Sequence, residues 1–492
     1  MNPTVSVAVV WNRHGPVPIT WGTPVHLQKA LEGLALNPVL PEGLVRRLIA
    51  HRRGEVAARP DLTTGLIDEM IGTGEPRLLR ALAFNERLPE SFRLRLARHP
   101  DAAVLAALAA GCRHGTAREV FELLLTASEP TTRKFLAENK AMPDDLRERL
   151  AADPSAEVRA TLARHWPAAP EHVRRALLTD ADDGVREAAC SAHHPGLPLP
   201  DLVPALLADP VTRAGVVRHL ALDERTARWL AQDPDADVRV ELARHPRLPA
   251  ELRDVLGADA NPRVRVGVFQ RQDTPEPLRA AIHADLGAVP LSFGGDEQLE
   301  RAVASGELRM LRLEWVRADP LPHVGSPYPC FRASAASSHE ALPPEAVARL
   351  LADDEQDIRW IMAEHAPHLV DAATAERMDR EFNPADTNFA PWRPADVLRF
   401  PAQVLRRFAT DPDPRMRCLA PRDPDLPGGI AAALAADPAA EVRHAVAGHH
   451  NLPEHALVAL LDDPDERTVH AAAGSLWLPV REMERLLRLA EL

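Results

Sequence analysis

The sequence predicts an all-α solenoid, a stack of short two-helix repeats of about 26 residues. An apolar residue followed by proline recurs at this interval near the C-terminus, at Phe400-Pro401, Leu426-Pro427, Leu452-Pro453 and Leu478-Pro479. Ten residues after each of the first three prolines stands an aspartate that is itself followed by proline, at Asp411, Asp437 and Asp463. A unit of this size is too small to bury a core alone, so neighbouring copies must stack.

The composition limits the kind of partner and the compartment. The chain has 492 residues and a formal net charge of −13, which disfavours nucleic acid as a partner because binding its backbone requires Lys and Arg. The four cysteines stand far apart without a CxxC pair, as in a reducing compartment, and they fit neither a disulfide framework nor a zinc ribbon. No apolar run approaches the ~20 residues that span a bilayer, and residues 5–10 lack the basic flank of a signal peptide. We therefore expect no membrane contact and a cytoplasmic protein.

Four parts follow one another along the chain. Residues 1–26 do not follow the repeat and form a tail or cap, or a small binding element, with a candidate strand near the start. Residues 27–283 form an N-terminal solenoid. Residues 284–330, rich in Pro and Gly, form an irregular insertion or kink with one helical piece. Residues 331–492 form a C-terminal solenoid, whose last helix is the polar cap that a solenoid end requires.

The copy at residues 248–283 illustrates the role of each position. A proline opens the first helix, where its missing N–H costs nothing. Leu252, Val255 and Leu256 then form one apolar stripe at helical spacing. In most copies an Asp-Pro pair ends this helix and starts the second, with Asp accepting hydrogen bonds from free N–H groups and Pro at the first helical position.

A polar residue precedes most repeat-opening prolines by four positions. These residues are Asn37, Asn85, Asn139, His245, His339, Asp423 and His449. Asn, and less often His or Asp, adopts the left-handed conformation that ends a helix, and its side chain can bond the backbone of the next turn. This structural role accounts for several of the 21 histidines without a catalytic or metal-binding function.

An aspartate and an arginine six residues apart occur together in seven copies. The pairs are Asp153/Arg159, Asp180/Arg186, Asp233/Arg239, Asp259/Arg265, Asp353/Arg359, Asp411/Arg417 and Asp437/Arg443. This Asp-x5-Arg spacing, usually with Val or Ile before the Arg, resembles the second helix of HEAT repeats. That resemblance implies a hydrogen-bonded ladder of Asp and Arg between successive repeats, although the period here is shorter than the ~40–47 residues of HEAT repeats.

The short unit opened by Leu-Pro is more similar to the leucine-rich repeat variant proteins of bacteria. This resemblance covers most of residues 27–283 and 331–492. It implies a right-handed superhelix that pairs a helix with a shorter helix. Some of these proteins carry an N-terminal cysteine-rich iron–sulfur segment, but no cysteine precedes Cys112 here, so we expect no cofactor.

Most residues that could bind a metal or act in catalysis stand at positions that the repeat already explains. His193-His194 and His449-His450 resemble metal pairs, but adjacent helical residues point to different sides and seldom share one ion. The acidic pairs at 353–354 and 462–463 each contain the repeat aspartate. Cys330 is either a reactive thiol or, as is commoner, a buried one. We therefore expect no catalytic and no metal-binding residues.

Aromatic residues in or beside the two irregular stretches are the candidate interaction residues. They are Trp315, Tyr328, Phe331 and Trp392. Aromatic side chains anchor interfaces well, and repeat arrays place insertions on one face, often the binding face. The alternative is that these residues fill a kink between two solenoid halves.

The sequence favours a non-catalytic scaffold that binds a protein partner on an extended surface. One alternative is an enzyme, because some HEAT-like solenoids are DNA glycosylases and others are lyases. A second alternative is a nucleic-acid binder, which would place Arg on one face. The identity of the partner and the oligomeric state do not follow from the sequence.

Overall fold

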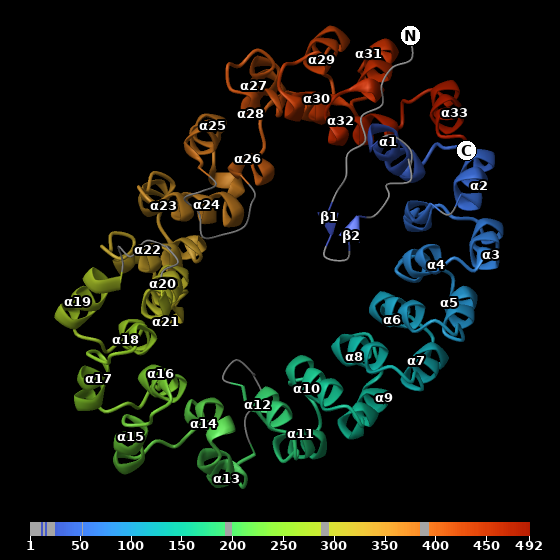
Figure 1. Ribbon diagram of the computed structural model, residues 1–492. Helices are drawn as coiled ribbons and strands as arrows, with labels where there is room; N and C mark the ends of the chain where they lie inside the picture. The colour runs from blue at the N-terminus through green and yellow to red at the C-terminus, as the bar shows by residue number, and fades with distance from the viewer. Residues whose placement is uncertain are drawn as a thin grey trace. The chain divides into compact units, whose positions relative to one another are not determined.

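The protein is an α-solenoid, described by a computed structural model for residues 11–12, 15–16, 25–51, 53–191, 199–286, 295–383 and 393–492 (Figure 1). The chain divides into two compact units. Unit 1 comprises Met1–Leu96 and Ala402–Leu492, and unit 2 comprises Ala97–Pro401. Within each unit the helices form two layers, here called inner and outer, and the chain alternates between them.

In unit 2, successive inner helices pack against one another. The inner helices are α6 (Ala102–Gly111), α8 (Pro130–Glu138), α10 (Ala156–His165), α12 (Asp183–Ala189), α14 (Pro210–Val217), α16 (Ala236–Arg244), α18 (Pro262–Phe269), α20 (Gly295–Met310), α22 (Pro329–Ala336), α24 (Gln356–His365) and α26 (Pro394–Val397).

The outer elements of unit 2 and its short connecting helices are generally shorter. They are α7 (Arg118–Leu125), α9 (Asp144–Glu148), η2 (Arg149–Ala152), α11 (Glu171–Leu178), α13 (Val203–Ala208), α15 (Glu224–Leu230), α17 (Ala250–Leu256), α19 (Glu276–Leu286), α21 (Glu314–Ala318), η3 (Leu321–His323), η4 (His339–Ala341), α23 (Pro344–Leu351), η5 (Pro367–Leu369) and α25 (Ala372–Glu381).

Unit 1 combines helices from both ends of the chain. Its inner layer contains α28 (Pro414–Arg417), η7 (Ala420–Arg422), α30 (Ala440–Val446), α32 (Glu466–Ala473), α1 (Val25–Leu36), η1 (Gly54–Ala58) and α4 (Pro76–Ala83). Its outer layer contains α27 (Ala402–Phe408), α29 (Gly428–Ala435), α31 (Glu454–Ala459), η8 (Leu460–Asp462), α33 (Val480–Leu489), α2 (Glu42–Ala50), α3 (Thr64–Thr73) and α5 (Glu90–Leu96). Ahead of α1, the strands β1 (Trp11–Asn12) and β2 (Gly15–Pro16) pair antiparallel.

The first helix of the chain packs directly on the last inner helix. Helix α1 contacts α32, and it also contacts α33. A Cβ atom on Gly33 of α1 would overlap the backbone oxygen of His470 in α32, so the two helices approach as closely as only glycine permits. The inner layer of unit 1 therefore continues from α32 into α1. Helix α33, expected to cap the solenoid, lies against another repeat.

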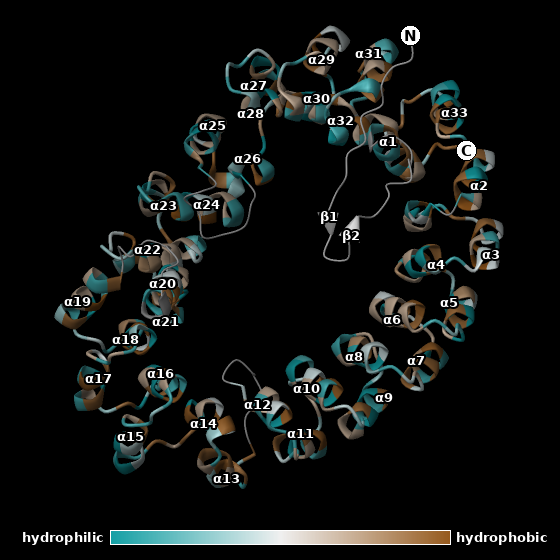
Figure 2. Cartoon of the chain, in the orientation of Figure 1, coloured by the Kyte–Doolittle hydropathy of each residue, from teal (hydrophilic) through white to brown (hydrophobic). Residues whose placement is uncertain are grey.

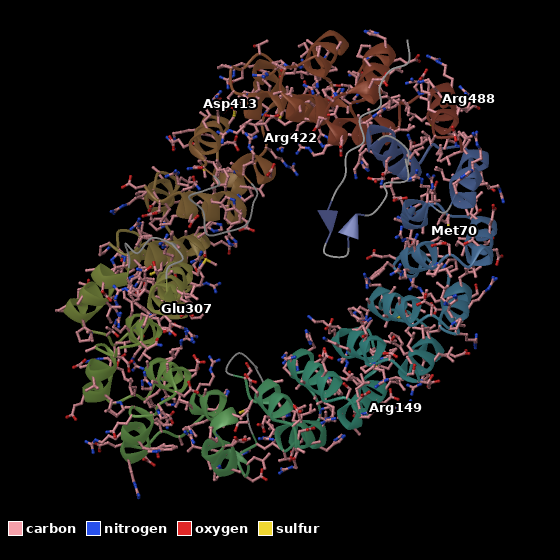
Figure 3. All side chains as sticks on the ribbon, in the orientation of Figure 1. Met70, Arg149, Glu307, Asp413, Arg422 and Arg488 are labelled. Carbon is pink, nitrogen blue, oxygen red and sulfur yellow. The ribbon has the colours of Figure 1, made fainter. Side chains whose placement is uncertain are left out.

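The core lies between the two layers. Leu and Val side chains of inner and outer helices are buried against one another, and each buried side chain of this kind contributes roughly 1.5–3 kcal/mol. Figure 2 shows polar and apolar residues together along the helices, as expected for elements that bury one face. Met70 of α3 is fully buried, whereas Arg149 and Arg488 are exposed among the charged side chains of the surface (Figure 3).

Three details of the predicted repeat are wrong. Val255 is 61% exposed, because α17 is short and turns its Arg253 and Leu256 toward the core. In the copy at Asp153, the Asp-Pro pair lies in the turn and the next helix begins later, at Ala156. The polar turn residues are not left-handed, since among described non-glycine residues only Glu491 has positive φ.

The polar turn residues instead connect successive repeats. Asn85 accepts a hydrogen bond from the backbone N–H of Arg87 (2.9 Å) and donates to the carbonyls of Ala57 (2.7 Å) and Arg59 (2.8 Å) in the preceding repeat. Asn37, Asn139, His245 and His449 make equivalent bonds. Asp423 accepts the bond within its own turn and a second one from Nε of Arg406 at 2.6 Å. Among the described residues, neither ring nitrogen of His339 has a partner.

Arginine takes the same role at two turns that have no Asn or His. Arg59 donates to the carbonyls of Ala35 (3.0 Å) and Asn37 (2.6 Å), and Arg271 donates to Ala243 and His245. A backbone carbonyl buried without a partner is costly. These side chains therefore satisfy groups that the stacking of repeats removes from water, and we call the series the turn ladder.

Candidate functional site

Three of the four predicted interaction aromatics lie close together in unit 2. Trp315 belongs to α21, Tyr328 precedes α22, and Phe331 lies within α22. The Phe331 ring packs edge-on against both Trp315 (centroids 5.2 Å apart) and Tyr328 (5.3 Å). Tyr328 and Phe331 are buried, and Trp315 is half-buried. Trp392 lies outside the described residues.

These aromatics form the floor of a hollow of about 1000 Å³, here called the outer hollow. Between the outer helices α19 and α23, the outer layer formed by the described residues consists of α21, the short η3 helix and their connecting turns. Lining residues come from three segments, residues 272–279, 315–331 and 343–349. They are Gln272, Glu276, Arg279, Trp315, Leu321, Pro322, His323, Val324, Gly325, Ser326, Pro327, Tyr328, Phe331, Pro343, Glu345, Ala346 and Arg349.

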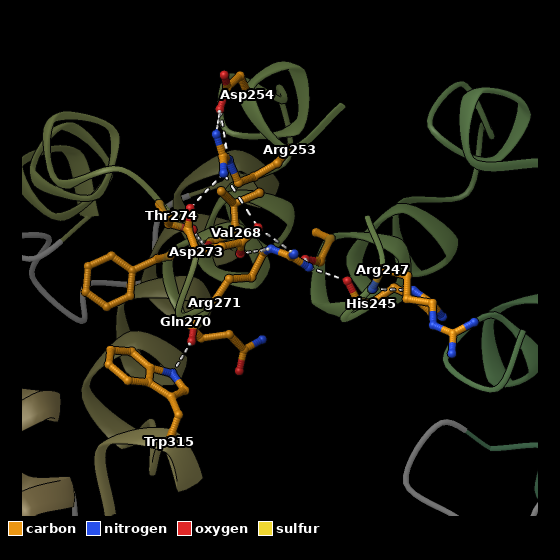
Figure 4. Close-up of polar contacts among 12 residues, drawn as sticks. His245, Arg247, Arg253, Asp254, Val268, Gln270, Arg271, Asp273, Thr274 and Trp315 are labelled. Carbon is orange, nitrogen blue, oxygen red and sulfur yellow. Dashed lines mark hydrogen bonds and ion pairs between the residues drawn. The ribbon is translucent and has the colours of Figure 1, made fainter. Parts of the chain in front are cut away.

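Hydrogen bonds fix the floor of the outer hollow. The indole N–H of Trp315 donates to the backbone oxygen of Gln270 at 2.9 Å (Figure 4). The buried Arg279 donates to the carbonyls of Phe269 (3.3 Å) and Arg271 (2.6 Å). Its guanidinium group lies over the Phe331 ring, 5.2 Å from the centroid, an additional cation–π contact. The aromatic floor is therefore held in one arrangement before any ligand arrives.

Some charged side chains at the outer hollow have a partner, whereas Arg349 at its rim has none among the described residues. Tyr328 donates its hydroxyl proton to Glu276 at 2.5 Å, and burial together with this bond raises the pKa of Tyr328 to about 12. Burial lowers the pKa of His323, which favours its neutral form at pH 7. The guanidinium group of Arg349 is exposed beside Gly325, and it forms no hydrogen bond or ion pair with any described residue. The rim thus offers an unpaired guanidinium group next to an aromatic floor.

The predicted aspartate and arginine residues meet between repeats. Arg159 donates from Nη1 to the carbonyl of Asp153 in its own repeat (2.8 Å). It also donates from Nε and Nη2 to the carboxylate of Asp180 in the next repeat (2.7 and 2.8 Å). The corresponding pairs are Arg186–Asp209, Arg239–Asp259, Arg265–Asp285, Arg359–Glu381, Arg417–Asp437 and Arg443–Asp463. We call this series the Arg–Asp ladder.

Three further arginines belong to the Arg–Asp ladder, although the Asp-x5-Arg spacing does not identify them. Arg133, Arg213 and Arg332 have no aspartate six residues before them, yet they pair with Asp153, Asp233 and Asp353. Each donates to the backbone carbonyl six residues earlier, whichever residue supplies it. An arginine followed by aspartate 20 or 21 residues later is the signal that finds them.

The ladder pairs are mostly shielded from solvent, and the pairing lowers the pKa of ladder carboxyl groups. The Arg443 and Asp463 side chains are 13% and 5% exposed. The hydrogen bonds from Arg159 and Arg417 are the largest cause that holds the pKa of Asp180 and of Asp437 below the usual range. Removing one partner of a buried pair leaves an uncompensated charge, so the ladder carboxylates stabilise the stack.

One repeat of unit 1 matches a known family. Residues 440–465 match the family model described as leucine rich repeat variant. This segment is a leucine rich repeat variant repeat. It contains α30, α31 and η8 together with the ladder residues Arg443 and Asp463, and it confirms the predicted resemblance for these residues. No curated protein matches the chain.

The paired histidines and Cys330 are the other residues considered for metal binding or thiol chemistry. In the variant repeat, His449 bonds the carbonyl of Asp423 (3.0 Å) and its ring stacks on His450. Within the described residues, no group of His, Cys, Asp or Glu could hold a metal ion, and His193-His194 lie outside them. Cys330 is buried, and burial raises its pKa to about 12. No described helix has the length and apolarity needed to cross a bilayer.

Proposed function

We propose that the protein is a non-catalytic repeat scaffold that binds a protein partner at the outer hollow. The partner would insert an aromatic or aliphatic side chain against Trp315 and Phe331. The observation that carries this proposal is the hollow itself, about 1000 Å³ with an aromatic floor. Residues that contribute most to protein–protein binding are commonly aromatic or Arg anchors in such pockets.

The two ladders support a scaffold role. Within each unit, successive repeats are joined at several places by hydrogen bonds from the turn ladder or the Arg–Asp ladder. A stack connected in this way presents surface side chains at fixed spacings. The hollow lies where the described outer layer consists of shorter elements, so a partner can reach the core-facing aromatics there.

The charge distribution supports a protein partner over nucleic acid. Ladder arginines are committed to aspartates, and exposed arginines are often paired as well, such as Arg118 with Asp145 and Arg175 with Asp201. A nucleic-acid backbone requires several guanidinium or ammonium groups free to neutralise successive phosphates. The proposed site depends instead on apolar contact, with Arg349 at its rim.

The test uses affinity capture with matched surface variants. Full-length protein is immobilised, and host lysate is passed over it with and without nuclease. Leu321, 52% exposed at the rim, is changed to Glu, which places a charge in the hollow without touching the core. Val255, 61% exposed on α17 outside the hollow, is changed to Glu as the control.

The proposal predicts a protein that is captured after nuclease treatment by the wild type and by Val255→Glu. Its capture should fall strongly with Leu321→Glu. Equal capture by both variants would exclude the outer hollow as the binding site. Capture that disappears with nuclease would instead support the nucleic-acid alternative.

A further inference from the structure

Two charged side chains of opposite sign stand one turn apart on the α23 rim of the outer hollow. Glu345 and Arg349 are both exposed and both line the hollow. Neither forms a hydrogen bond or an ion pair with any described residue. On the opposite rim, Glu276 of α19 is already engaged by Tyr328 and Arg279. The α23 rim therefore offers one carboxylate and one guanidinium group to a ligand.

The place of Glu345 in the repeat shows where its side chain is directed. In three repeats, the residue eight positions before the ladder aspartate contacts the preceding outer helix. These contacts are Asp145–Arg118, His172–Glu148 and Asp201–Arg175, at 2.5, 3.3 and 2.6 Å. Glu345 stands eight positions before the ladder residue Asp353. Its side chain is therefore directed toward the place of a preceding outer helix.

The outer hollow lies at that place, and its size suits a helix. Here the described outer layer contains α21 with five residues and η3 with three, whereas α19 has eleven residues and α23 has eight. A helix of eight residues is about 12 Å long and about 10 Å across, a volume of roughly 900 Å³. The volume of the hollow is about 1000 Å³, so a helix as long as α23 fits in it.

The floor of the outer hollow leaves apolar surface uncovered. A regular outer helix buries an apolar face on the inner layer, as α11 does with Val173, Leu177 and Leu178. In the hollow, Leu321 is 52% exposed and Trp315 is half-buried. An amphipathic helix covers such a surface with apolar residues at i, i+3 and i+4.

The hydrogen bonds of the floor favour a helix over an extended segment. The indole N–H of Trp315 and the guanidinium group of Arg279 already donate to backbone carbonyls. An extended segment would bring unpaired backbone N–H and C=O groups against the aromatic rings, which is costly. A helix satisfies these groups internally and presents only side chains to the floor.

We propose that the outer hollow binds an amphipathic α-helix of the partner protein, which completes the outer layer between α19 and α23. This inference rests on the proposed function. The apolar face of the helix covers Trp315 and Leu321. A Lys or Arg at the edge of that face pairs with Glu345, as neighbouring outer helices pair elsewhere in the chain. An Asp or Glu about one turn away pairs with Arg349.

The test begins with random peptides displayed on phage and selected on immobilised full-length protein. A selected peptide is labelled with fluorescein and titrated by anisotropy with the wild type, Leu321→Glu and Glu345→Lys. The matched control is Glu251→Lys, because Glu251 is exposed, stands eight positions before the ladder residue Asp259, and lies on α17 outside the hollow. Thermal unfolding verifies that each variant is folded.

The selected peptide is expected to bind as a helix in the hollow. Leu321→Glu should weaken its binding strongly. Proline at its centre should weaken binding roughly 100-fold, as in a helix interior, whereas proline at its first position should be tolerated. Glu345→Lys should weaken binding about threefold, as for an exposed ion pair. Changing the basic residue of the peptide to Glu should restore binding to Glu345→Lys, and Glu251→Lys should bind like the wild type.

The inference and the proposed function fail in different ways. A peptide that loses binding to Leu321→Glu but tolerates central proline would overturn the helix and leave the proposed function standing. Equal binding by the wild type and Glu345→Lys, without rescue by charge reversal, would do the same for the pairing at Glu345. Selection of no peptide, or of peptides that bind Leu321→Glu as well as the wild type, would contradict both.

Discussion

The side-chain amide of Asn37 donates a hydrogen bond to the backbone carbonyl of Ser475, 2.8 Å away and 438 residues later in the chain. It also donates to Ala473 at 3.0 Å. Asn139 makes the same two bonds to the repeat that directly precedes it in sequence, at Ala109 and Cys112. In unit 1 the last repeat thus occupies the position of a preceding repeat for the first one, and the turn ladder is continuous across the chain ends.

Asn37→Ala is therefore expected to loosen both ends of the chain. The substitution leaves two buried carbonyls without this donor and should cost about 1–3 kcal/mol of stability. Hydrogen exchange should accelerate in α1 and α32 together, although they are distant in sequence. Asn139→Ala removes equivalent bonds within unit 2 and serves as the control, since it should leave exchange in α1 and α32 unchanged. Faster exchange in α1 alone would contradict the coupling.

Gly33→Ala tests the close approach of the same two helices. The added methyl group would overlap the backbone oxygen of His470, and such overpacking costs about 1–3 kcal/mol. Gly43 in α2 has no atom within 4 Å of the corresponding position, so Gly43→Ala should be neutral or slightly stabilising. Urea denaturation of the two variants checks the difference, and an equal response would show that α1 and α32 are not in contact in solution.

How much the sequence predicts depends on the distance between the interacting residues. The pairing of Arg159 with Asp180 lies within one repeat interval, so spacing alone points to it. No regular spacing in the sequence indicates the contact between Asn37 and Ser475. Each resembles an ordinary turn residue, and the two meet only after the repeats have stacked. The outer hollow escapes prediction for a related reason, since it arises from the space that a missing outer helix leaves around Trp315.

The sequence predicts the positions of side chains better than their roles. The spacing locates the polar turn residues, but the general preference of Asn for the left-handed region predicts the wrong backbone conformation for them. His245 is extended, with φ −65° and ψ 128°. In this conformation its ring reaches the carbonyl of Leu220 in the preceding repeat. The hydrogen bond to that buried carbonyl therefore decides the backbone conformation, rather than the local preference for the left-handed region.

Thiol labelling tests the environment of Cys330. Burial raises the pKa of Cys330 and of Cys190 to about 12, so both remain protonated at pH 8 and lie out of reach of solvent. We expect no modification of either by iodoacetamide in the folded protein, and full modification after denaturation. Cys418 is partly exposed and is the internal comparison by peptide mass mapping. Rapid modification of Cys330 in the folded state would restore the interpretation of a reactive thiol.

Acid titration tests the Arg–Asp ladder at Asp437. The hydrogen bond from Arg417 lowers the pKa of Asp437 in the folded state, relative to about 3.9 in the unfolded chain. Its stabilising effect is therefore complete above the unfolded value and is lost as the pH falls through the folded one. Asp437→Asn should cost roughly 3 kcal/mol at pH 7, as for a mostly buried pair, and should weaken the dependence of stability on pH below about 4.

The matched control is Asp145→Asn, because Arg118 binds Asp145 through the same two-bond geometry on an exposed surface. The two side chains are 51% and 62% exposed, so solvent screens this pair and Asp145→Asn should destabilise the protein much less than Asp437→Asn. Urea denaturation of both variants at pH 7 and at pH 4 separates the contributions. Equal losses for Asp437→Asn and Asp145→Asn would mean that the ladder gains nothing from its burial between repeats, and that stacking rests on the apolar contacts and the turn ladder alone.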